Sequence, residues 1–291
     1  MSIFLLSIGF GLVTAAVLAL ASVGLTLQFG VTNYVNFAFG AFLTLGAYLT
    51  WAASSVLHLP FVVGALVGTL GVAVIAVLCG QYVMGPFVRR RSNLLFLLIV
   101  TFGLSLILSN LVQAIWGVDF QSFNLPTPSP VTIGPFIFTG QQLAIMVIAV
   151  LAMLGVHLML TRTTLGKQMR AMSDSTDLAQ ISGIDTQRIT LFTWFLSGAL
   201  GGLAGVAFAL NTIQFEPTFG DQFLFVIFAA VILGGIGQPY GAMLGALAIG
   251  LVTEVSAAFV SAAYKEDIAF VLLVIMLLLR PQGLIPAKGK A

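Results

Sequence analysis

Charged residues are scarce in this 291-residue sequence, at 7%, whereas 59% of its residues are hydrophobic. Ordinary soluble domains carry about 25% charged residues. A chain with so little charge lacks the polar surface that a soluble protein needs, so lipid must be its solvent. Its apolar runs are long and continuous, whereas barrel strands alternate polar and apolar residues over about ten positions. We therefore predict an all-α polytopic membrane protein.

Cysteine and histidine are also nearly absent. The single cysteine, Cys79, excludes an internal disulfide and a cysteine-based metal cluster. His58 and His157 are far apart and have no cysteine or paired carboxylates beside them, so we expect no metal site. No G-x-x-x-x-G-K-[ST] phosphate-binding loop occurs. We therefore expect neither catalytic residues nor a cofactor bound by this chain.

Charges and turn residues divide the sequence into nine apolar segments. Their approximate bounds are 5–29, 34–57, 60–86, 93–116, 141–161, 189–211, 222–236, 240–262 and 266–280. A membrane helix needs about 20 apolar residues, so the segments at 222–236 and 266–280 are short. We expect about eight to nine transmembrane helices, some short or broken, in one domain over residues 1–291. No Lys or Arg precedes the first apolar run, so we expect a retained span rather than a signal peptide.

The basic residues indicate the orientation. Ten of the eleven form three clusters, namely Arg89–Arg91, then Arg162, Lys167, Arg170 and Arg188, and finally Arg280, Lys288 and Lys290. Cytoplasmic loops are rich in Lys and Arg, so we place all three clusters and the C-terminus in the cytoplasm. This topology also explains the basic residues without a nucleic-acid partner. Lys265 then lies outside, offset by Glu266 and Asp267.

The connection 117–140 is then extracytoplasmic. Proline interrupts helices, so the prolines at 126, 128, 130 and 135 exclude a long helix here.

The cytoplasmic stretch at about 162–188 has helix signals of its own. Within "TRTTLGKQMRAMSDSTDLAQISGIDTQRI", Ser175 or Thr176 can cap a short helix over 177–182, and Gly183 can end it. Asp185 can cap the next span. The pattern fits either a helix that docks onto a cytoplasmic partner or a solvated surface loop.

The stretch "GVTNYVNFAFGAFLTLGAY" places Asn33 and Asn36 where no charged residue occurs between Met1 and Val88. We expect Gly30 and Gly40 to bend or interrupt the chain at membrane depth, which is tolerated only inside protein or along a cavity. Asn33, Asn36 and Gln28 then line the pathway or satisfy the broken backbone; hydrogen bonding between helices is the alternative. We expect Asn36 to act through backbone support more than through substrate choice.

Glycine and carboxylate mark three further segments. "VILGGIGQPYG" predicts a tight turn, and the pair Gly241 and Gly245 predicts close helix packing. In "SGALGGLAGVAFAL" the glycines leave one helix face almost bare, which favours close packing. Glu254 lies inside an apolar span, which suggests function unless it lies near the outer boundary or is hydrogen-bonded. We expect Glu216 and Asp221 to be charges of an outer loop.

Several separated stretches together resemble the permease subunits of ABC importers for branched-chain amino acids. They are "GLTLQFGVTNYVNFAFGAFLTLGAY", "TTLGKQMRAMSDSTDLAQISGID", "GALGGLAGV", "VILGGIGQPYGAMLGALAIGLVTE" and "LLLRPQGL". Many members continue after the motif at Asn36 with a histidine, a glycine and an acidic residue, whereas Phe39, Gly40 and Ala41 stand here.

The resemblance implies a permease domain that moves branched-chain or related amino acids into a prokaryotic cytoplasm by alternating access. It implies that the chain is integral to the inner membrane of a prokaryote. It implies as partners a second permease subunit, two cytoplasmic ATPases that bind ATP and Mg, and an extracytoplasmic solute-binding protein. The ATPase-coupling residues would be Thr164, Gly166, Lys167, Arg170, Ala171, Ala179 and Gly183; the pathway residues would be Gln28, Asn33, Asn36 and Glu254. The rival hypothesis is an ion-coupled secondary transporter that uses Glu254.

Overall fold

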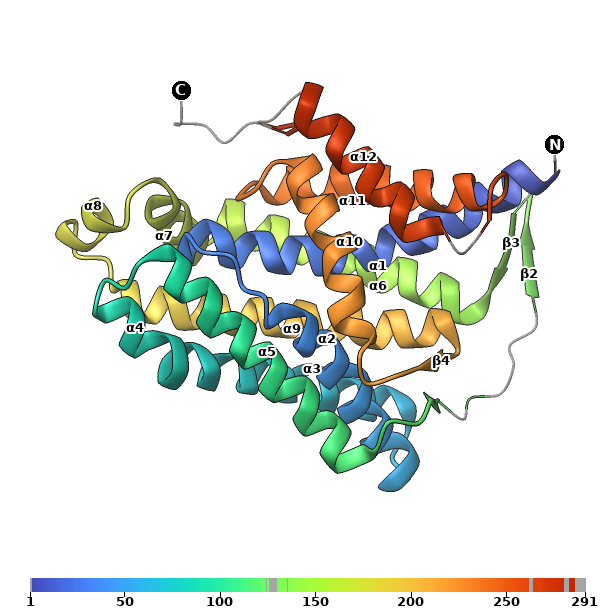
Figure 1. Cartoon of the computed structure of the whole chain (residues 1–291), viewed down its shortest axis with the longest axis horizontal. Coiled ribbons are helices and arrows are strands. Elements are labelled where there is room, and N and C mark those ends of the chain that lie inside the picture. The colour runs from blue at the N-terminus through green and yellow to red at the C-terminus, as the bar shows by residue number, and fades with distance from the viewer. Residues whose placement is uncertain are drawn as a thin grey trace. The chain divides into compact units, whose positions relative to one another are not determined.

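The structure is a computed structural model that describes residues 2–123, 125, 130–134, 136–261, 264–279 and 283–285. Helices dominate these ranges (Figure 1). The elements are α1 (Ser2–Thr32), α2 (Phe39–Trp51), the π-helix η1 (Ala52–Val56), α3 (Phe61–Leu78), the π-helix η2 (Cys79–Met84), α4 (Gly85–Arg89), α5 (Leu94–Trp116), β1 (Gln121–Ser122), β2 (Pro130–Ile133), β3 (Phe136–Thr139), α6 (Gly140–Arg162), α7 (Thr164–Asp174), α8 (Thr176–Ile181), α9 (Thr186–Thr212), β4 (Gln214–Phe215), α10 (Phe219–Gly234), α11 (Pro239–Ala257) and α12 (Lys265–Leu279).

Seven helices in the described ranges are long and apolar enough to cross a membrane. They are Phe4–Thr32, Phe39–Val56, Phe61–Arg89, Leu94–Trp116, Gly140–Arg162, Thr186–Thr212 and Pro239–Ala257. Two shorter apolar helices, Phe219–Gly234 and Asp267–Leu279, coincide with the two segments that the sequence marks as short. The predicted fold class, an all-α membrane protein with some short or broken helices, is confirmed.

Contacts between residues divide the chain into two compact units. Unit 1 comprises Met1–Val23, Asn124–Gly155 and Phe225–Ala291, and unit 2 comprises Gly24–Phe123 and Val156–Leu224. The division falls within α1, α6 and α10, so the chain changes unit inside continuous helices. A single permease domain over residues 1–291 stays a prediction.

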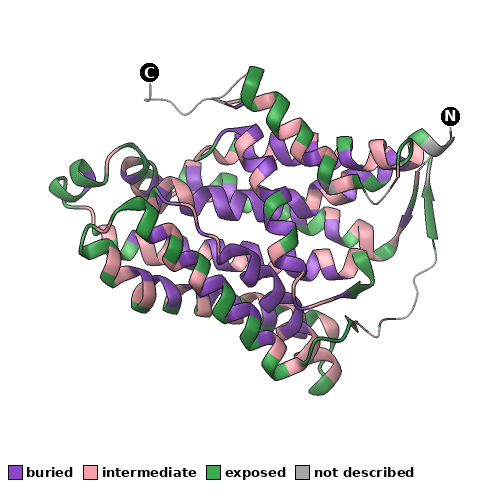
Figure 2. Ribbon diagram, in the orientation of Figure 1, coloured by how far each residue is buried: buried purple, intermediate pink, exposed green. Residues whose placement is uncertain are grey.

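Unit 2 is built around α2, α3 and α9, whose inner faces are almost fully buried (Figure 2). The backbones of α2 and α9 touch, since a Cβ atom on Gly46 would lie 2.6 Å from the Cα atom of Gly202. Gly205 lies equally close to the backbone of Leu43. The glycine-rich face of α9 therefore serves close helix packing, as the sequence predicts.

Unit 1 contains the hairpin of α10 and α11. Its turn uses two glycines with positive φ, Gly235 at 110° and Gly237 at 84°. Gly241 packs against Gly234, and Gly245 packs against Ala230, so the predicted tight turn and close packing are confirmed. The end of α10 is also held by the C-terminal segment 283–285, where Leu284 N donates to Leu233 O at 2.9 Å and Ile285 N to Gly234 O at 3.1 Å.

The connection after α5 contains no helix in its described residues, in agreement with its proline content. In unit 2, β1 pairs antiparallel with β4, with Gln121 opposite Phe215. In unit 1, β2 and β3 form a hairpin that begins at Pro130. Pro126, Pro128, Pro135 and the basic cluster Arg280, Lys288 and Lys290 lie outside the described residues.

Candidate functional site

Helix α1 ends at Thr32, and α2 begins at Phe39, so the chain is not helical between them. Asn33 has a φ of 59°, in the left-handed region that asparagine tolerates better than most residues. The expected break is therefore present, but the glycines are not its cause, because Gly30 lies within α1 and Gly40 within α2. Both sit in regular helix, where Gly40 serves packing, and Asn33 changes the direction of the chain.

Gln28 and Asn36 form a buried amide pair across this break. Asn36 Nδ2 donates to Gln28 Oε1 at 3.1 Å, and Ser197 Oγ of α9 donates to the same oxygen at 3.1 Å. Asn36 Oδ1 accepts from Ala38 N at 3.0 Å, so the side chain supports backbone that precedes α2. Both amides are at most 1% exposed. An unpaired buried polar group costs about 1–3 kcal/mol. The network avoids this cost for Gln28 Oε1 and for the bonded atoms of Asn36, but Gln28 Nε2 has no partner among the described residues.

The starts of α2 and α10 cross within unit 2. Gly220 packs against the backbone of Gly40, and Gly220 N donates to Thr44 Oγ1 at 3.2 Å. A Cβ atom at Gly40 would lie 3.1 Å from the Cα atom of Asp221. Two interrupted helices thus begin at one point, an arrangement that transporters use to form sites within the membrane.

Asp221 beside this crossing is not the outer-loop charge that the sequence suggests. It lies in the first turn of α10, where a carboxylate favours the helix dipole. Its two oxygens accept from Ser105 Oγ at 2.9 Å and Ser109 Oγ at 2.6 Å, both on α5. No ion pair to Asp221 is found within the described part of the chain.

The depth of Asp221 follows from its serine partners. Ser105 and Ser109 lie in the middle of α5, which runs from Leu94 to Trp116. At 1.5 Å per residue, they are about 10–23 Å from the two ends of that helix. Sequence reasoning missed this contact, although two serines four residues apart in an apolar span mark one polar face.

Glu254 belongs to unit 1 and is fully engaged. Its Oε1 accepts from Thr14 Oγ1 at 2.9 Å, and its Oε2 pairs with Lys265 Nζ at 2.7 Å. The Glu254 side chain is 15% exposed. The sequence places Lys265 beside Glu266 and Asp267, whereas its ion pair in the structure is with Glu254, from the next helix.

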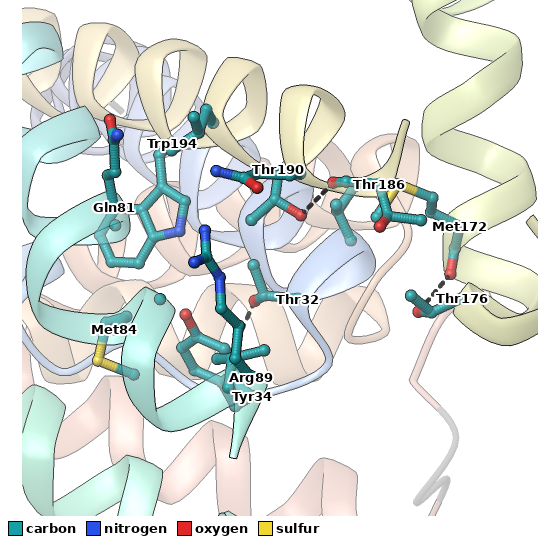
Figure 3. Close-up of a pocket in the computed structure, with 16 residues that line it drawn as sticks. Thr32, Tyr34, Gln81, Met84, Arg89, Met172, Thr176, Thr186, Thr190 and Trp194 are labelled. Carbon is teal, nitrogen blue, oxygen red and sulfur yellow. Dashed lines mark hydrogen bonds between the residues drawn. The ribbon is translucent and has the colours of Figure 1, made fainter. Parts of the chain in front are cut away.

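A cavity of about 340 Å³ opens in unit 2. Its wall comes from the end of α1, from η2 and α4, from α7 and α8, and from the first turns of α9. Arg89, Trp194 and Thr190 face the same space, and Gln81 also lines it (Figure 3). None of its lining residues is acidic. The cavity was not predicted, since its wall combines residues far apart in sequence.

Most of the residues predicted for ATPase coupling lie on α7 and α8. The predicted capping is confirmed: Ser175 Oγ accepts from Leu178 N at 3.3 Å, Gly183 has a φ of 82°, and Asp185 caps α9. The eleven-residue α7 was missed, although Leu165, Met169 and Met172 recur at helical spacing.

The seven predicted coupling residues divide by exposure. Gly166 is buried against the backbone of Leu160, and Ala179 is also buried, so both hold the segment together. The rest are exposed or half-buried, namely Thr164, Lys167, Arg170, Ala171 and Gly183. On α8 the apolar side chains of Leu178 and Ile181 are 66% and 83% exposed. Most of α8 is exposed (Figure 2), and its exposed residues include these two large apolar side chains.

Within the described residues, no three His, Cys, Asp or Glu side chains gather where they could hold a metal ion. The cavity and the Asp221 contact are two polar sites of unit 2.

Comparison with known proteins gives consistent matches along nearly the whole chain. The family model described as branched-chain amino acid transport system, permease component, matches residues 7–278. The probable branched-chain amino acid transport permease protein LivH of Methanocaldococcus jannaschii is 30% identical over 92% of this chain and 88% of its own. The high-affinity branched-chain amino acid permease LivH of Escherichia coli is 29% identical over 94% and 93%.

A solved structure shares the fold. A chain of PsaBC from Streptococcus pneumoniae, determined in complex with Fab, superposes with a TM-score of 0.53 and covers 94% of this chain and 91% of its own. The sequence identity is 15%, so this likeness concerns the fold alone.

Proposed function

The chain belongs to the family of permease components of branched-chain amino acid transport systems, and on this premise we propose that it forms the membrane pathway of an ATP-driven amino acid importer. It is a transport component rather than an enzyme. The proposed cycle is alternating access: ATP binding closes two partner ATPases, the α7–α8 segment moves, and the helices switch between outward-open and inward-open states. ATP and Mg would be bound by those partners alone.

The observation that carries this proposal is the α7–α8 segment. It is tied to the membrane helices on both sides, through Gly166 against the end of α6 and through Asp185 at the start of α9. Its outer surface combines the basic Lys167 and Arg170 with exposed Leu178 and Ile181. A short, firmly held helix with an apolar outer face suits docking into a groove of a soluble partner.

The orientation rests on the basic residues. Arg89, Arg90 and Arg91 stand at the end of α4 and just after it, and Lys167 and Arg170 lie on α7. We propose that both groups and the C-terminus face the cytoplasm, in the inner membrane of a prokaryote. An external solute-binding protein would then deliver substrate from the opposite side, where the connection after α5 lies.

The pathway itself is proposed to include Gln28, Asn33, Asn36 and Glu254. The contacts of Asn36 favour a supporting role, since its amide bonds Gln28 Oε1 and the backbone of Ala38. Gln28 Oε1 accepts from Asn36 and Ser197, whereas Gln28 Nε2 has no hydrogen-bond partner among the described residues and remains a donor for the pathway. Asn33 is exposed, and Glu254 is paired with Lys265. A paired carboxylate is a poor ion-coupling site, which speaks against the secondary-transporter hypothesis.

The substrate class is proposed from the relatives, whose names specify branched-chain amino acids. A second permease subunit, of a different kind, is proposed to complete the pathway.

The test is uptake of labelled leucine, isoleucine and valine into proteoliposomes that contain the chain, a second permease, two ATPases and a binding protein. We expect uptake to require ATP and to survive an uncoupler. Uptake that persists without the ATPases and stops with the uncoupler would establish the ion-coupled alternative.

A matched pair of variants tests the docking face. Ile181→Asp places a charge on the most exposed apolar position of α8, so it should separate ATP hydrolysis from uptake. Gln180→Glu adds the same charge to the exposed neighbour and should leave coupling intact. Equal coupling in the two variants would remove α8 from the interface.

A further inference from the structure

The cavity lined by Arg89 and Trp194 is a candidate ligand site that the proposed function does not use. We propose that it binds the zwitterionic head and branched side chain of a free amino acid at the cytoplasmic end of the pathway. This inference rests on the proposed function for its orientation and its ligand class. Its evidence comes from the cavity wall.

Two donors of the wall suit a carboxylate. Arg89 contributes a permanent positive charge, and no lining residue is acidic, so the cation has no competing anion within the cavity. Trp194 is fully buried, and its Nε1–H has no hydrogen-bond partner among the described residues. The phenol of Tyr34 lies near this N–H, but the contact falls outside hydrogen-bond geometry.

Such an unpaired indole N–H is unusual, because buried donors are nearly always bonded. It points into a space that holds a guanidinium as well (Figure 3). A carboxylate has two oxygens, so it can accept from the indole and the guanidinium together.

Three threonine hydroxyls of the wall suit an ammonium group. Each donates its proton to a backbone carbonyl: Thr32 to Gln28 O at 2.8 Å, Thr190 to Thr186 O at 2.8 Å, and Thr176 of α8 to Met172 O of α7 at 3.4 Å. Their oxygens therefore offer only lone pairs to the cavity, and an ammonium is a donor without an acceptor. The cavity wall therefore offers donors for a carboxylate and acceptors for an ammonium group.

The rest of the wall is largely apolar. Val31, Met84, Val88 and Leu191 contribute aliphatic or thioether surface beside the Trp194 ring. The volume of about 340 Å³ lies at the lower end of the range of about 300–1,000 Å³ for small-molecule pockets. A small amino acid with a branched side chain matches this combination of size and lining.

The cavity also includes part of the proposed coupling segment. Met172 of α7 and Thr176 of α8 line it together with residues of the membrane helices. Movement of α7 and α8 would therefore change the cavity directly, so occupancy and ATPase state would be linked.

Trp194 supplies a direct probe of this site. We would place the full-length chain in phosphatidylcholine nanodiscs, with Trp51→Phe and Trp116→Phe, so that Trp194 is the one remaining tryptophan. Leucine should shift the Trp194 emission to longer wavelength in a saturable manner, because its carboxylate hydrogen-bonds the indole. Leucinamide lacks the carboxylate, and 4-methylpentanoate lacks the ammonium; each should bind at least about tenfold more weakly.

The matched variants are Arg89→Gln and Arg90→Gln, neighbouring arginines of which only the first lines the cavity. Arg89→Gln should weaken the leucine response at least about tenfold, and Arg90→Gln should not change it. Equal responses in the two variants, or equal binding of leucine and leucinamide, would overturn the proposal.

Replacing phosphatidylcholine with phosphatidylglycerol separates a lipid from an amino acid. A shift caused by the anionic lipid, with none from leucine, would assign the cavity to a headgroup and overturn the proposal. The fluorescence assay needs no ATP, so a failure here with intact ATP-dependent uptake would refute the subsite and leave the proposed function standing.

Discussion

Asp221 in unit 2 and Glu254 in unit 1 are both carboxylates in apolar helices, and they are satisfied in different ways. Glu254 shares its charge with Lys265 at 2.7 Å and takes one further bond from Thr14. Asp221 receives two serine hydroxyls and no cation within the described residues. Hydroxyl groups satisfy the oxygens of a carboxylate but leave its net charge uncompensated.

This difference separates a structural role from a functional one. An ion pair with a half-exposed lysine explains why a carboxylate can remain in α11. A carboxylate near the middle of α5, held only by neutral donors, is costly in lipid and is the kind of group that marks a pathway. The comparison therefore gives Asp221 the larger expected effect on transport, although the sequence favours Glu254.

The largest effect is expected for Asp221→Asn. This change keeps the shape of the side chain and one acceptor but removes the charge, so the protein should fold while uptake falls at least about tenfold. Proteoliposome uptake, normalised to the amount of folded protein, measures this. Glu254→Gln is the paired control and should retain most of the uptake. If Glu254→Gln lost more uptake than Asp221→Asn, Asp221 would not be the more important carboxylate for transport.

The next effect is expected for Ser109→Ala and Ser105→Ala. Each variant removes one donor to Asp221, and a hydrogen bond to a charged group contributes about 1.5–3 kcal/mol. Ser109→Ala should destabilise more, since its contact is the shorter at 2.6 Å. Thermal unfolding in detergent measures the loss.

Ser54→Ala is the matched control for the serine variants, because Ser54 donates only to carbonyls of its own helix. Its stability should change by about 0.5 kcal/mol or less. In the Asp221→Asn background the two serine variants should cost less than in the wild type, and full additivity would show that the contact is unimportant.

A smaller effect is expected at the Glu254 ion pair. Lys265 is 38% exposed, and such pairs contribute about 0–1 kcal/mol. Lys265→Met should leave the carboxylate partly uncompensated, so it should destabilise more than the double variant Glu254→Gln with Lys265→Met. A double-mutant cycle by thermal unfolding gives the coupling energy; a value well above 1 kcal/mol would make this pair as important as the Asp221 contact.

The smallest effect is expected at Glu216, which precedes the same helix as Asp221. Its Oε1 accepts locally from Thr218 Oγ1 and Gln222 Nε2, both at 2.9 Å. Glu216→Gln keeps an acceptor, so the free energy of unfolding should change by no more than about 0.5 kcal/mol. The rate of uptake should change by no more than about twofold. A large loss of uptake would extend the functional region from Asp221 to the preceding turn.

Local signals in the sequence were sufficient where the physics is local. The span predicted near 93–116 is the helix Leu94–Trp116, because an apolar run and its flanking turns fix a membrane helix. The caps at Ser175 and Asp185 follow from side chains that bond backbone a few residues on.

Sequence-based prediction failed where the interacting residues are distant in sequence. It also failed where neighbouring residues could each interrupt a helix. The Asp221 contact joins residues 112 and 116 positions apart, so no local pattern reveals it. The sequence predicts that Gly30 and Gly40 interrupt the chain before α2, whereas both lie in helices and Asn33 is the residue with a left-handed conformation. The wall of the cavity combines residues of six helices, α1, η2, α4, α7, α8 and α9, so no local pattern predicts it.

The composition of unit 1 has a consequence for biosynthesis. Unit 2 is complete in sequence once Leu224 has been made, whereas unit 1 combines the first 23 residues with segments that extend to the C-terminus. Ala15 meets Gly250 only after residue 250 has been made, and the last carbonyls of α10 meet Leu284 and Ile285 only after those residues have been made. At about 5–20 residues per second, the amino-terminal helix waits more than ten seconds in the translocon or the bilayer for these partners. The packing of unit 1 is therefore completed later in synthesis than that of unit 2.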